Sequence, residues 1–289
     1  MKILTVLFGE GYRSGPQMSR TRGTGDYIRR QMLASKSHIK LVNMLKTQGH
    51  EVDVILNTYK LNEKDDNDLL HYYQRNSNVI QSFFYDHLFP SENHFFENMF
   101  FNVIPQPNDY DFVLIIRIDF YVKQLFFETL KFAEDKITFP FIDSNININY
   151  SNETNQFSVC HPIILVPKKY FCAFLDHNFY IHHPHELRIE LINSGVPKDD
   201  IIFMTNTLHV CSTDLGWNPF FIMVGRGYNN LYNTSCSCCS TIEHYYDTES
   251  HKFVYDLSKT TERWKDYLDT DTLEQNMAEL KENSFDELQ

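Results

Sequence analysis

Arg117 and Asp119 are the residues whose types and spacing best suit a chemical role. They follow the apolar run 112–116, which has the composition of a strand buried on both faces. Ligands of open α/β sheets bind outside the carboxyl ends of the strands. Two residues apart on an extended chain, the side chains share a face, so the acid can hold a divalent metal ion while the arginine binds a phosphate oxygen. The alternative interpretation is a buried ion pair.

A basic segment follows the first apolar run of the chain. Residues 13–30 contain five arginines and one acid. A parallel fold brings this segment to the same edge of the sheet as Asp119, where Arg13, Arg20 and Arg22 can clamp a diphosphate with help from glycine amides. The segment lacks the GxxxxGK[ST] and GxGxxG patterns of common phosphate-binding loops, and a solvated basic loop is the alternative.

Three further charged residues lie beside predicted elements in the second half of the chain. Asp214 follows a short strand at 208–210 and can complete a metal site or fix a sugar hydroxyl. Arg226 follows an apolar run at 221–224. Glu186 opens a predicted helix, where the helix dipole alone favours an acid.

The elements that must position these residues begin with a strand over 2–8, a helix over 27–48 and a strand over 52–59. Apolar residues recur at three- and four-residue spacing along the helix, and Gly49 supplies its stop. The order strand, helix, strand predicts a right-handed βαβ unit and a parallel sheet.

The rest of the chain continues the alternation of helices and strands. After an acidic connector, the pattern predicts helices over 68–87, 91–101, 123–134, 168–178 and 186–194, and strands over 112–116, 137–142, 159–166, 201–204, 208–210 and 221–224. The predicted fold class is α/β, with a mixed, mostly parallel central sheet flanked by helices in a Rossmann-like arrangement. We expect residues 1–260 to form a single domain and residues 261–289 an acidic, partly helical tail.

Composition limits the classes of function. At 42% hydrophobic residues, the 289-residue chain can bury a core, and its net charge of −12 argues against sequence-independent binding of nucleic acid. No apolar run is long enough to predict a membrane span. The six cysteines do not demand disulfides, so a reducing compartment such as the cytoplasm is expected. Cys236, Cys238 and Cys239 lack a fourth ligand at zinc-site spacing, which favours reduced thiols over a metal site.

The order of these features resembles the GT-A-type glycosyltransferase-like proteins of large DNA viruses of algae and protists, and of some bacteria. The resemblance covers roughly residues 1–230. It is carried by the N-terminal strand with its arginine-bearing loop, Ser35-Lys-Ser-His38, Asp109 through Asp119, Ser212-Thr-Asp214 and Gly225-Arg226.

The resemblance implies a GT-A fold, a nucleotide-diphosphate sugar as donor, a glycan or protein acceptor, and Mn²⁺ or Mg²⁺ as cofactor. Asp119 stands where the family has its DxD-type acid, and Arg117 replaces the first acid of that motif, so Asp214 would supply the second metal ligand. Glu186 would be the catalytic base. Five arginines would bind the donor: Arg13, Arg20, Arg22, Arg117 and Arg226. A viral protein of this kind would act in the host cytoplasm.

Two other classes of function fit the same sequence. One is a non-catalytic binding or virion-associated protein that has kept the fold. The other is a different nucleotide-dependent transferase, whose basic loop would bind a donor without a sugar.

Overall fold

The chain begins with the βαβ unit that its sequence predicts. In the computed structural model, β1 (Lys2–Gly9) is followed by α1 (Tyr27–Thr47) and β2 (Glu51–Tyr59), and β1 pairs with β2 in parallel. Gly49 has a positive φ of 86°, which glycine adopts without strain and which ends the helix as expected. The structure describes residues 1–12, 27–86, 109–143, 158–159, 162–175, 187–204, 208–209, 220–223, 243–247 and 252–256.

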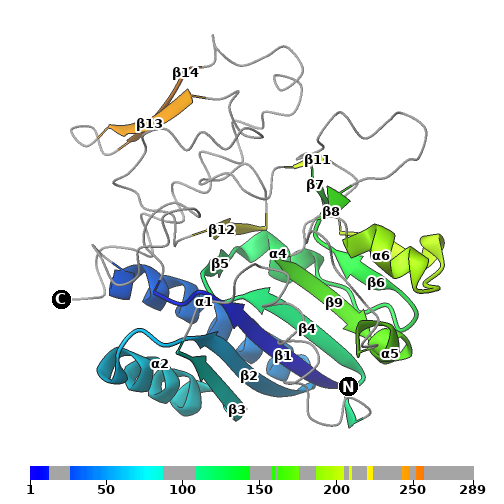
Figure 1. Cartoon of the computed structure of the whole chain (residues 1–289), viewed down its shortest axis with the longest axis horizontal. Helices are drawn as coiled ribbons and strands as arrows, with labels where there is room; N and C mark the ends of the chain where they lie inside the picture. The colour runs from blue at the N-terminus through cyan, green and yellow to red at the C-terminus, as the bar shows by residue number, and fades with distance from the viewer. Residues whose placement is uncertain are drawn as a thin grey trace.

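A seven-stranded sheet forms the centre of the described structure (Figure 1). Its order is β10-β6-β9-β4-β1-β2-β3. The five strands not yet introduced are β3 (Asn78–Tyr85), β4 (Phe112–Arg117), β6 (Ile137–Phe139), β9 (Ile163–Pro167) and β10 (Ile201–Phe203). Only β9 runs against its neighbours, β4 and β6, while every other pair in this sheet is parallel. The prediction of a mixed, mostly parallel central sheet is therefore confirmed.

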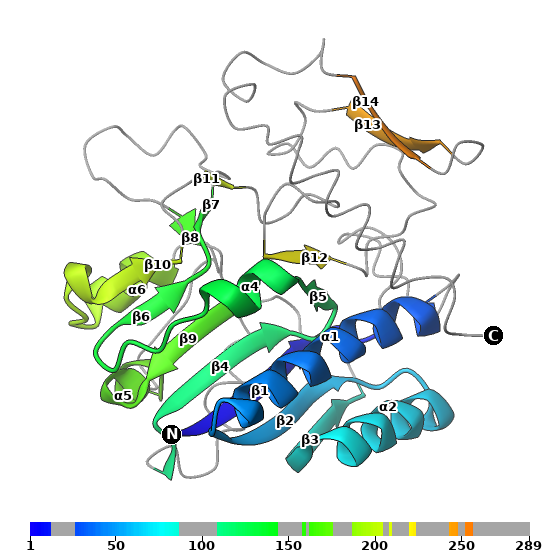
Figure 2. The ribbon, with the colours of Figure 1, turned by 180° about the vertical axis from the view of Figure 1, so that it is seen from behind.

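Helices cover both faces of the sheet (Figure 2). α1 and α2 (Glu63–Asn76) pack on the face formed by residues such as Leu7 and Leu114. α5 (Phe171–Leu175) and α6 (Leu187–Asn193) contribute to the core on the opposite face, with Val6 and Ile115. Consecutive residues of β1 and β4 thus point into two separate cores, which explains their continuous apolar sequences.

Smaller elements complete the described structure. β5 (Phe120–Val122) pairs with β12 (Phe221–Met223), and a three-stranded sheet joins β11 (Leu208–His209), β7 (Ile142–Asp143) and β8 (Ser158–Val159). The others are α4 (Gln124–Thr129), two short 3₁₀ helices, η2 (Lys168–Tyr170) and η4 (Lys198–Asp200), and a hairpin of β13 (Glu243–Asp247) and β14 (Lys252–Asp256).

The predictions for residues 63–87 are wrong in part. The acidic stretch after β2 is the first turn of α2, where the Asn62 side chain accepts from the Asp65 amide and the acids suit the helix dipole. The helix ends before Ser77, and the predicted remainder of the helix is the strand β3. Pairing with the edge of β2 decides the outcome, because the aromatic and β-branched side chains of this segment suit a strand as well as a helix.

Two further segments differ from the prediction. The predicted helix over 123–134 ends at Thr129, and Leu130 and Phe132 instead pack from irregular chain against the core. The hairpin of β13 and β14 lies in a polar stretch for which no strand is predicted. The predicted helix at 91–101 and the predicted tail at 261–289 lie outside the described residues, so the domain boundary stays a prediction.

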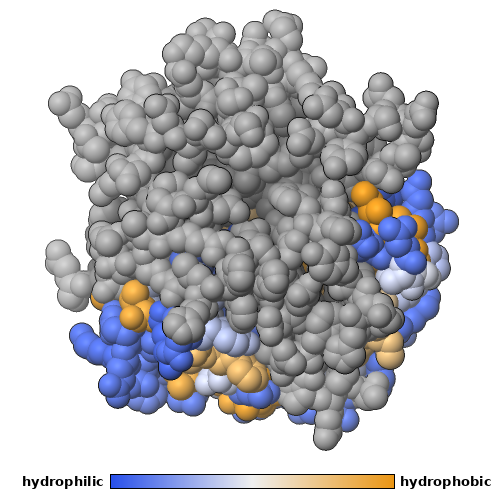
Figure 3. Space-filling view, viewed as in Figure 1, coloured by the Kyte–Doolittle hydropathy of each residue, from blue (hydrophilic) through white to orange (hydrophobic). Residues whose placement is uncertain are grey.

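The described surface offers no large apolar face. On the side shown in Figure 3 it is mostly hydrophilic, with hydrophobic areas at separate places. The exposed large hydrophobic side chains of the described residues are Met1, which precedes β1, and Ile28, Ile80 and Leu125, which lie on α1, β3 and α4. Within the described residues, no helix has the length and apolar character to cross a membrane.

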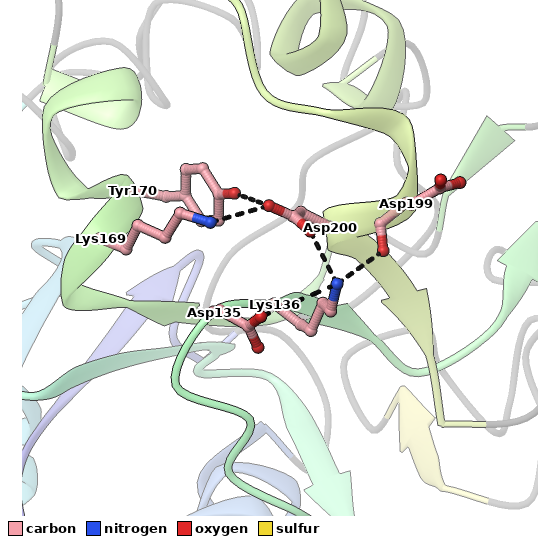
Figure 4. Close-up of polar contacts among 6 residues, drawn as sticks. All are labelled: Asp135, Lys136, Lys169, Tyr170, Asp199 and Asp200. Atoms are coloured by element: carbon pink, nitrogen blue, oxygen red, sulfur yellow. Dashed lines mark hydrogen bonds and ion pairs between the residues drawn. The ribbon is translucent and has the colours of Figure 1, made fainter.

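A polar cluster fastens the edge strand β10 to the amino edge of the sheet (Figure 4). Asp200 accepts hydrogen bonds from Lys136 Nζ at 2.7 Å, from Lys169 Nζ at 2.9 Å and from the Tyr170 hydroxyl. Lys136 also donates to the Asp199 carbonyl at 3.2 Å. The hydrogen bonds from Lys136, Tyr170 and Lys169 lower the pKa of Asp200 well below its ordinary value of 3.8. The cluster joins residues before β6 and β10 to residues after β9.

We expect Asp200→Asn to lower the melting temperature at pH 7, because the neutral amide cannot balance both lysines. The folded-state pKa of Asp200 is depressed, so its contribution is present above pH 3.8 and disappears as the pH falls. The difference in melting temperature between wild type and variant should therefore be full at pH 7 and smaller at pH 3. Asp199→Asn is the matched control, because the Asp199 side chain is exposed and only its carbonyl joins the cluster. Equal effects of the two variants would contradict this role.

Candidate active site

The candidate site lies where the strand order of the sheet reverses. From β1 the chain moves outward through β2 to β3 and then returns to β4 on the other side of β1. The gap between the ends of β1 and β4 is thus the topological switch point, where ligands of open α/β sheets bind. Figure 1 shows β1 and β4 running in the same direction, toward β5 and β12. Gly9 and Arg117 end the two strands.

The turn after β1 is held tightly against β2 and α2. Gly9 has a φ of 112° and Tyr12 a φ of 56°, and residues 11–12 form a turn. The Gly11 amide donates to Thr58 Oγ1 at 2.9 Å, and a Cβ on Gly11 would itself stand 2.9 Å from that oxygen. The buried Tyr12 hydroxyl donates to the Asp65 carbonyl at 2.6 Å. The basic segment that begins at residue 13 therefore leaves from a fixed point.

Arg117 and Asp119 form a two-pronged ion pair at the end of β4. Arg117 Nε donates to Asp119 Oδ1 at 2.9 Å, and Nη2 donates to Oδ2 at 2.7 Å. The arginine is 8% exposed and the aspartate 1%. The guanidinium carbon lies 5.0 Å from the centre of the Phe120 ring. The two side chains share a face, as predicted, and they form the buried ion pair that is the alternative interpretation of this spacing.

This pairing does not fit the metal-ligand role that the family resemblance gives to Asp119. Both carboxylate oxygens accept from a guanidinium, so a divalent ion on Asp119 would lie beside a full positive charge. Within the described parts of the chain, no group of three His, Cys, Asp or Glu residues is placed to hold a metal. What Asp119 does in this arrangement is fix the direction of the Arg117 guanidinium.

Three buried polar side chains of α1 hold the loop that carries this pair. Gln31 Nε2 donates to the Ile118 carbonyl at 3.0 Å, and Ser37 Oγ accepts from the Val122 amide at 2.9 Å. His38 Nε2 lies 2.8 Å from the Phe120 carbonyl. Alternate residues 118, 120 and 122 are thus each fixed from the helix.

His38 is neutral in this position. Because a carbonyl only accepts, Nε2 carries the proton, and Nδ1 accepts from the Tyr73 hydroxyl at 2.8 Å. Burial lowers the pKa of His38 from 6.5 to about 4, although the Phe120 carbonyl and the charge of Asp119 oppose the shift. At neutral pH the His38 ring therefore links α1 to α2 and to the loop after β4 through two fixed hydrogen bonds.

Sequence reasoning did not identify Gln31 or Asn57, and it used His38 only as part of the family resemblance, without a role at this site. Gln31 and His38 are buried in α1 together with Ser35 and Ser37, so polar residues at buried helical spacing were the available signal. Asn57, at the end of β2, is 0% exposed, and neither amide atom has a hydrogen-bond partner of normal geometry in the described structure. Burial raises the pKa of Tyr85, and the nearby side chain of Asn57 opposes this rise. A buried amide without hydrogen-bond partners lowers the stability of the folded state by about 1–3 kcal/mol, so such a group in a native structure suggests a functional role.

The remaining predicted site residues lie outside the described residues: Arg13, Arg20, Arg22, Glu186, Asp214 and Arg226. Their predicted roles are neither supported nor opposed by the geometry above.

Comparisons with known proteins give structural similarity only. No protein-family model matches the chain, and no curated protein sequence matches it. The galactosyltransferase LgtC, in complex with donor and acceptor sugar analogues, aligns over 93% of this chain and 100% of its own, at 10% identity and a TM-score of 0.41. An active-site variant of LgtC aligns over 70% and 72% at 12% identity and a TM-score of 0.40. The bifunctional glycosyltransferase WbbM aligns over 70% of this chain and 38% of its own, at 14% identity and a TM-score of 0.37. These scores are too low to carry a functional argument.

Proposed function

We propose that the chain is a glycosyltransferase that takes a sugar from a nucleotide-diphosphate donor and passes it to a glycan or protein acceptor. The observation that carries the proposal is a buried, rigidly oriented guanidinium at the switch point of a mostly parallel sheet. A switch point is where such sheets bind nucleotides, and a fixed arginine fork suits phosphate oxygens. The predicted family and the cytoplasmic location remain parts of this proposal.

The proposed chemistry breaks the bond between the anomeric carbon and the donor phosphate oxygen and forms a bond to an acceptor hydroxyl. Negative charge develops on the departing diphosphate, and Arg117 would stabilise it because Asp119 already holds the guanidinium in place. The predicted donor-binding arginines of the basic segment and Arg226 would add further positive charge that stabilises the departing diphosphate. Glu186 is the proposed base that receives the acceptor proton.

A divalent cation has a reduced part in this proposal. The family resemblance predicts Mn²⁺ or Mg²⁺, which would stabilise the diphosphate leaving group, but Asp119 does not fit as its ligand. We therefore propose that arginine side chains supply most of the positive charge for donor binding. Asp214 remains the proposed metal ligand if a cation takes part.

Two alternatives share the same nucleotide-binding edge. A non-catalytic or virion-associated protein would bind a nucleotide without turning it over. A different nucleotide-dependent transferase would bind the nucleotide but release no free sugar and transfer none.

A thermal-shift panel of nucleoside diphosphates and nucleotide sugars, each with Mn²⁺ and with EDTA, tests the proposal. We expect UDP or GDP and the matching nucleotide sugar to raise the melting temperature, and the shift to persist in EDTA. A ligand at a hundred times its Kd adds about 2.7 kcal/mol to the stability of the folded state.

The possible outcomes separate the proposals. No shift with any nucleotide would contradict nucleotide binding altogether. A shift that disappears in EDTA would contradict the arginine-based account and favour a metal site. Incubation of a binding nucleotide sugar with candidate acceptors, followed by measurement of released nucleoside diphosphate, then separates the transferase from a binding protein.

A further inference from the structure

We propose that Gln31 is a positioning residue that joins the two sides of the switch point, so that the turn after β1 and the Arg117–Asp119 loop behave as one unit. The inference rests on the proposed function, because it concerns the same nucleotide-binding edge. Gln31 lies in α1, and its side chain contacts the site only at the backbone atoms of Tyr12 and Ile118.

The side-chain amide of Gln31 makes one hydrogen bond to each side. Its Oε1 accepts from the Tyr12 amide at 3.0 Å, and its Nε2 donates to the Ile118 carbonyl at 3.0 Å. The two partners fix the orientation of the amide, because a flipped amide would face a donor with a donor and an acceptor with an acceptor. The side chain is 2% exposed, so water does not compete for these bonds.

Gln31 acts where the strand pairing between β1 and β4 has ended. The register of the two strands stops at Phe8 and Arg117, and the Ile118 amide makes one more bond to the Phe8 carbonyl. Beyond that point the segment after β1 continues to Tyr12 and the segment after β4 continues to Asp119, with no further strand pairing between them. The Gln31 amide therefore links the two segments beyond the last backbone hydrogen bond between them.

The neighbouring polar residues of α1 hold one side only. Ser37 contacts the Val122 amide, and His38 contacts the Phe120 carbonyl, both on the β4 side. Loss of either contact frees part of the Arg117–Asp119 loop but leaves the turn after β1 in place. Among these three residues, Gln31 alone contacts both the turn after β1 and the Arg117–Asp119 loop. Ser37 and His38 therefore offer matched controls within the same helix.

Coupling of this kind matters for a ligand that contacts both chains. A diphosphate bound between the turn at residues 9–12 and Arg117 gains its affinity only if both are in position together. Without the Gln31 bridge, binding must also order one side relative to the other. We expect Gln31→Met to weaken binding of UDP or GDP about tenfold or more, which corresponds to about 1.4 kcal/mol.

The test combines hydrogen exchange with nucleotide titration on the full chain. Gln31→Met removes both bonds, together with the longer one from Nε2 to Ser35 Oγ at 3.3 Å within α1, while keeping an unbranched side chain. Gln31→Glu keeps the acceptor for Tyr12 but loses the donor for Ile118, and Ser37→Ala is the control. Without ligand, we expect faster exchange in Gln31→Met at residues 9–12 and 118–122, but not in β2 or β3. Ser37→Ala should affect only the second segment, and Gln31→Glu chiefly that segment.

The outcomes distinguish this inference from the proposed function. If the wild-type protein binds no nucleotide, the proposed function fails, and the exchange pattern alone decides whether Gln31 couples the two segments. If it binds, nucleotide should protect both segments from exchange in wild type. Nucleotide binding should be markedly weaker in Gln31→Met but little changed in Ser37→Ala. Faster exchange in one segment only, a uniform rise across the sheet, or unchanged affinity in Gln31→Met would overturn the inference.

Discussion

Asp119→Ala is expected to lower the free energy of unfolding by about 3–5 kcal/mol, because it leaves the buried Arg117 guanidinium without its partner. The side chains of Arg117 and Asp119 are 10% and 1% exposed and are joined by two hydrogen bonds, so little solvent screening reduces the effect. Nucleotide binding should also be lost, since the guanidinium would no longer be held in one direction. Urea unfolding followed by circular dichroism measures the first effect, and calorimetric titration with UDP or GDP measures the second.

A double substitution separates stability from function at the same site. Arg117→Met with Asp119→Leu replaces the buried pair by apolar side chains, and such replacements are often neutral or stabilising. We expect this variant to unfold at a urea concentration well above that of Asp119→Ala and close to that of wild type, yet to bind no nucleotide. Binding at wild-type affinity would show that the ion pair belongs to the framework and that the ligand lies elsewhere.

The stability of the wild-type protein should fall as the pH decreases from 6.5 to about 4, because His38 is buried in its neutral form. Its folded-state pKa of about 4 lies below its ordinary value of 6.5, so the unfolded chain binds the proton first. The difference of about 2.5 in pKa corresponds to about 3 kcal/mol at 1.36 kcal/mol per unit. The contribution is complete above pH 6.5 and is lost as the pH approaches 4.

The variant His38→Gln isolates this effect. An amide can donate to the Phe120 carbonyl and accept from the Tyr73 hydroxyl, but it does not titrate in this range. Free energies of unfolding at several pH values between 6.5 and 4 should therefore show a steeper slope in wild type than in the variant. Burial also lowers the pKa of His50, but this residue is present in both proteins and its effect cancels in the comparison. Parallel slopes would contradict a buried neutral His38.

Local pattern predicted much of the framework of this site. The helical spacing of residues 27–48 and the stop at Gly49 predict α1 to within one residue of its observed end, and the apolar run 112–116 predicts β4. These patterns succeed because each depends on which sides of a single segment are buried. Residues 78–85 show the limit, since aromatic side chains there fit a helix or a strand, and pairing with β2 decides.

The sequence by itself determined that a strand would end in an arginine and an acid two residues later, and that both would lie at the ligand-binding edge of an α/β sheet. Only the tertiary structure decided that β4 returns beside β1 to make the switch point and that Gln31 reaches Ile118, 87 residues away, to bridge it. It also decided that Arg117 and Asp119 bind each other. The physical reason is desolvation: spacing places two charges together, but burial removes the water that would otherwise keep them apart and makes each the partner the other requires.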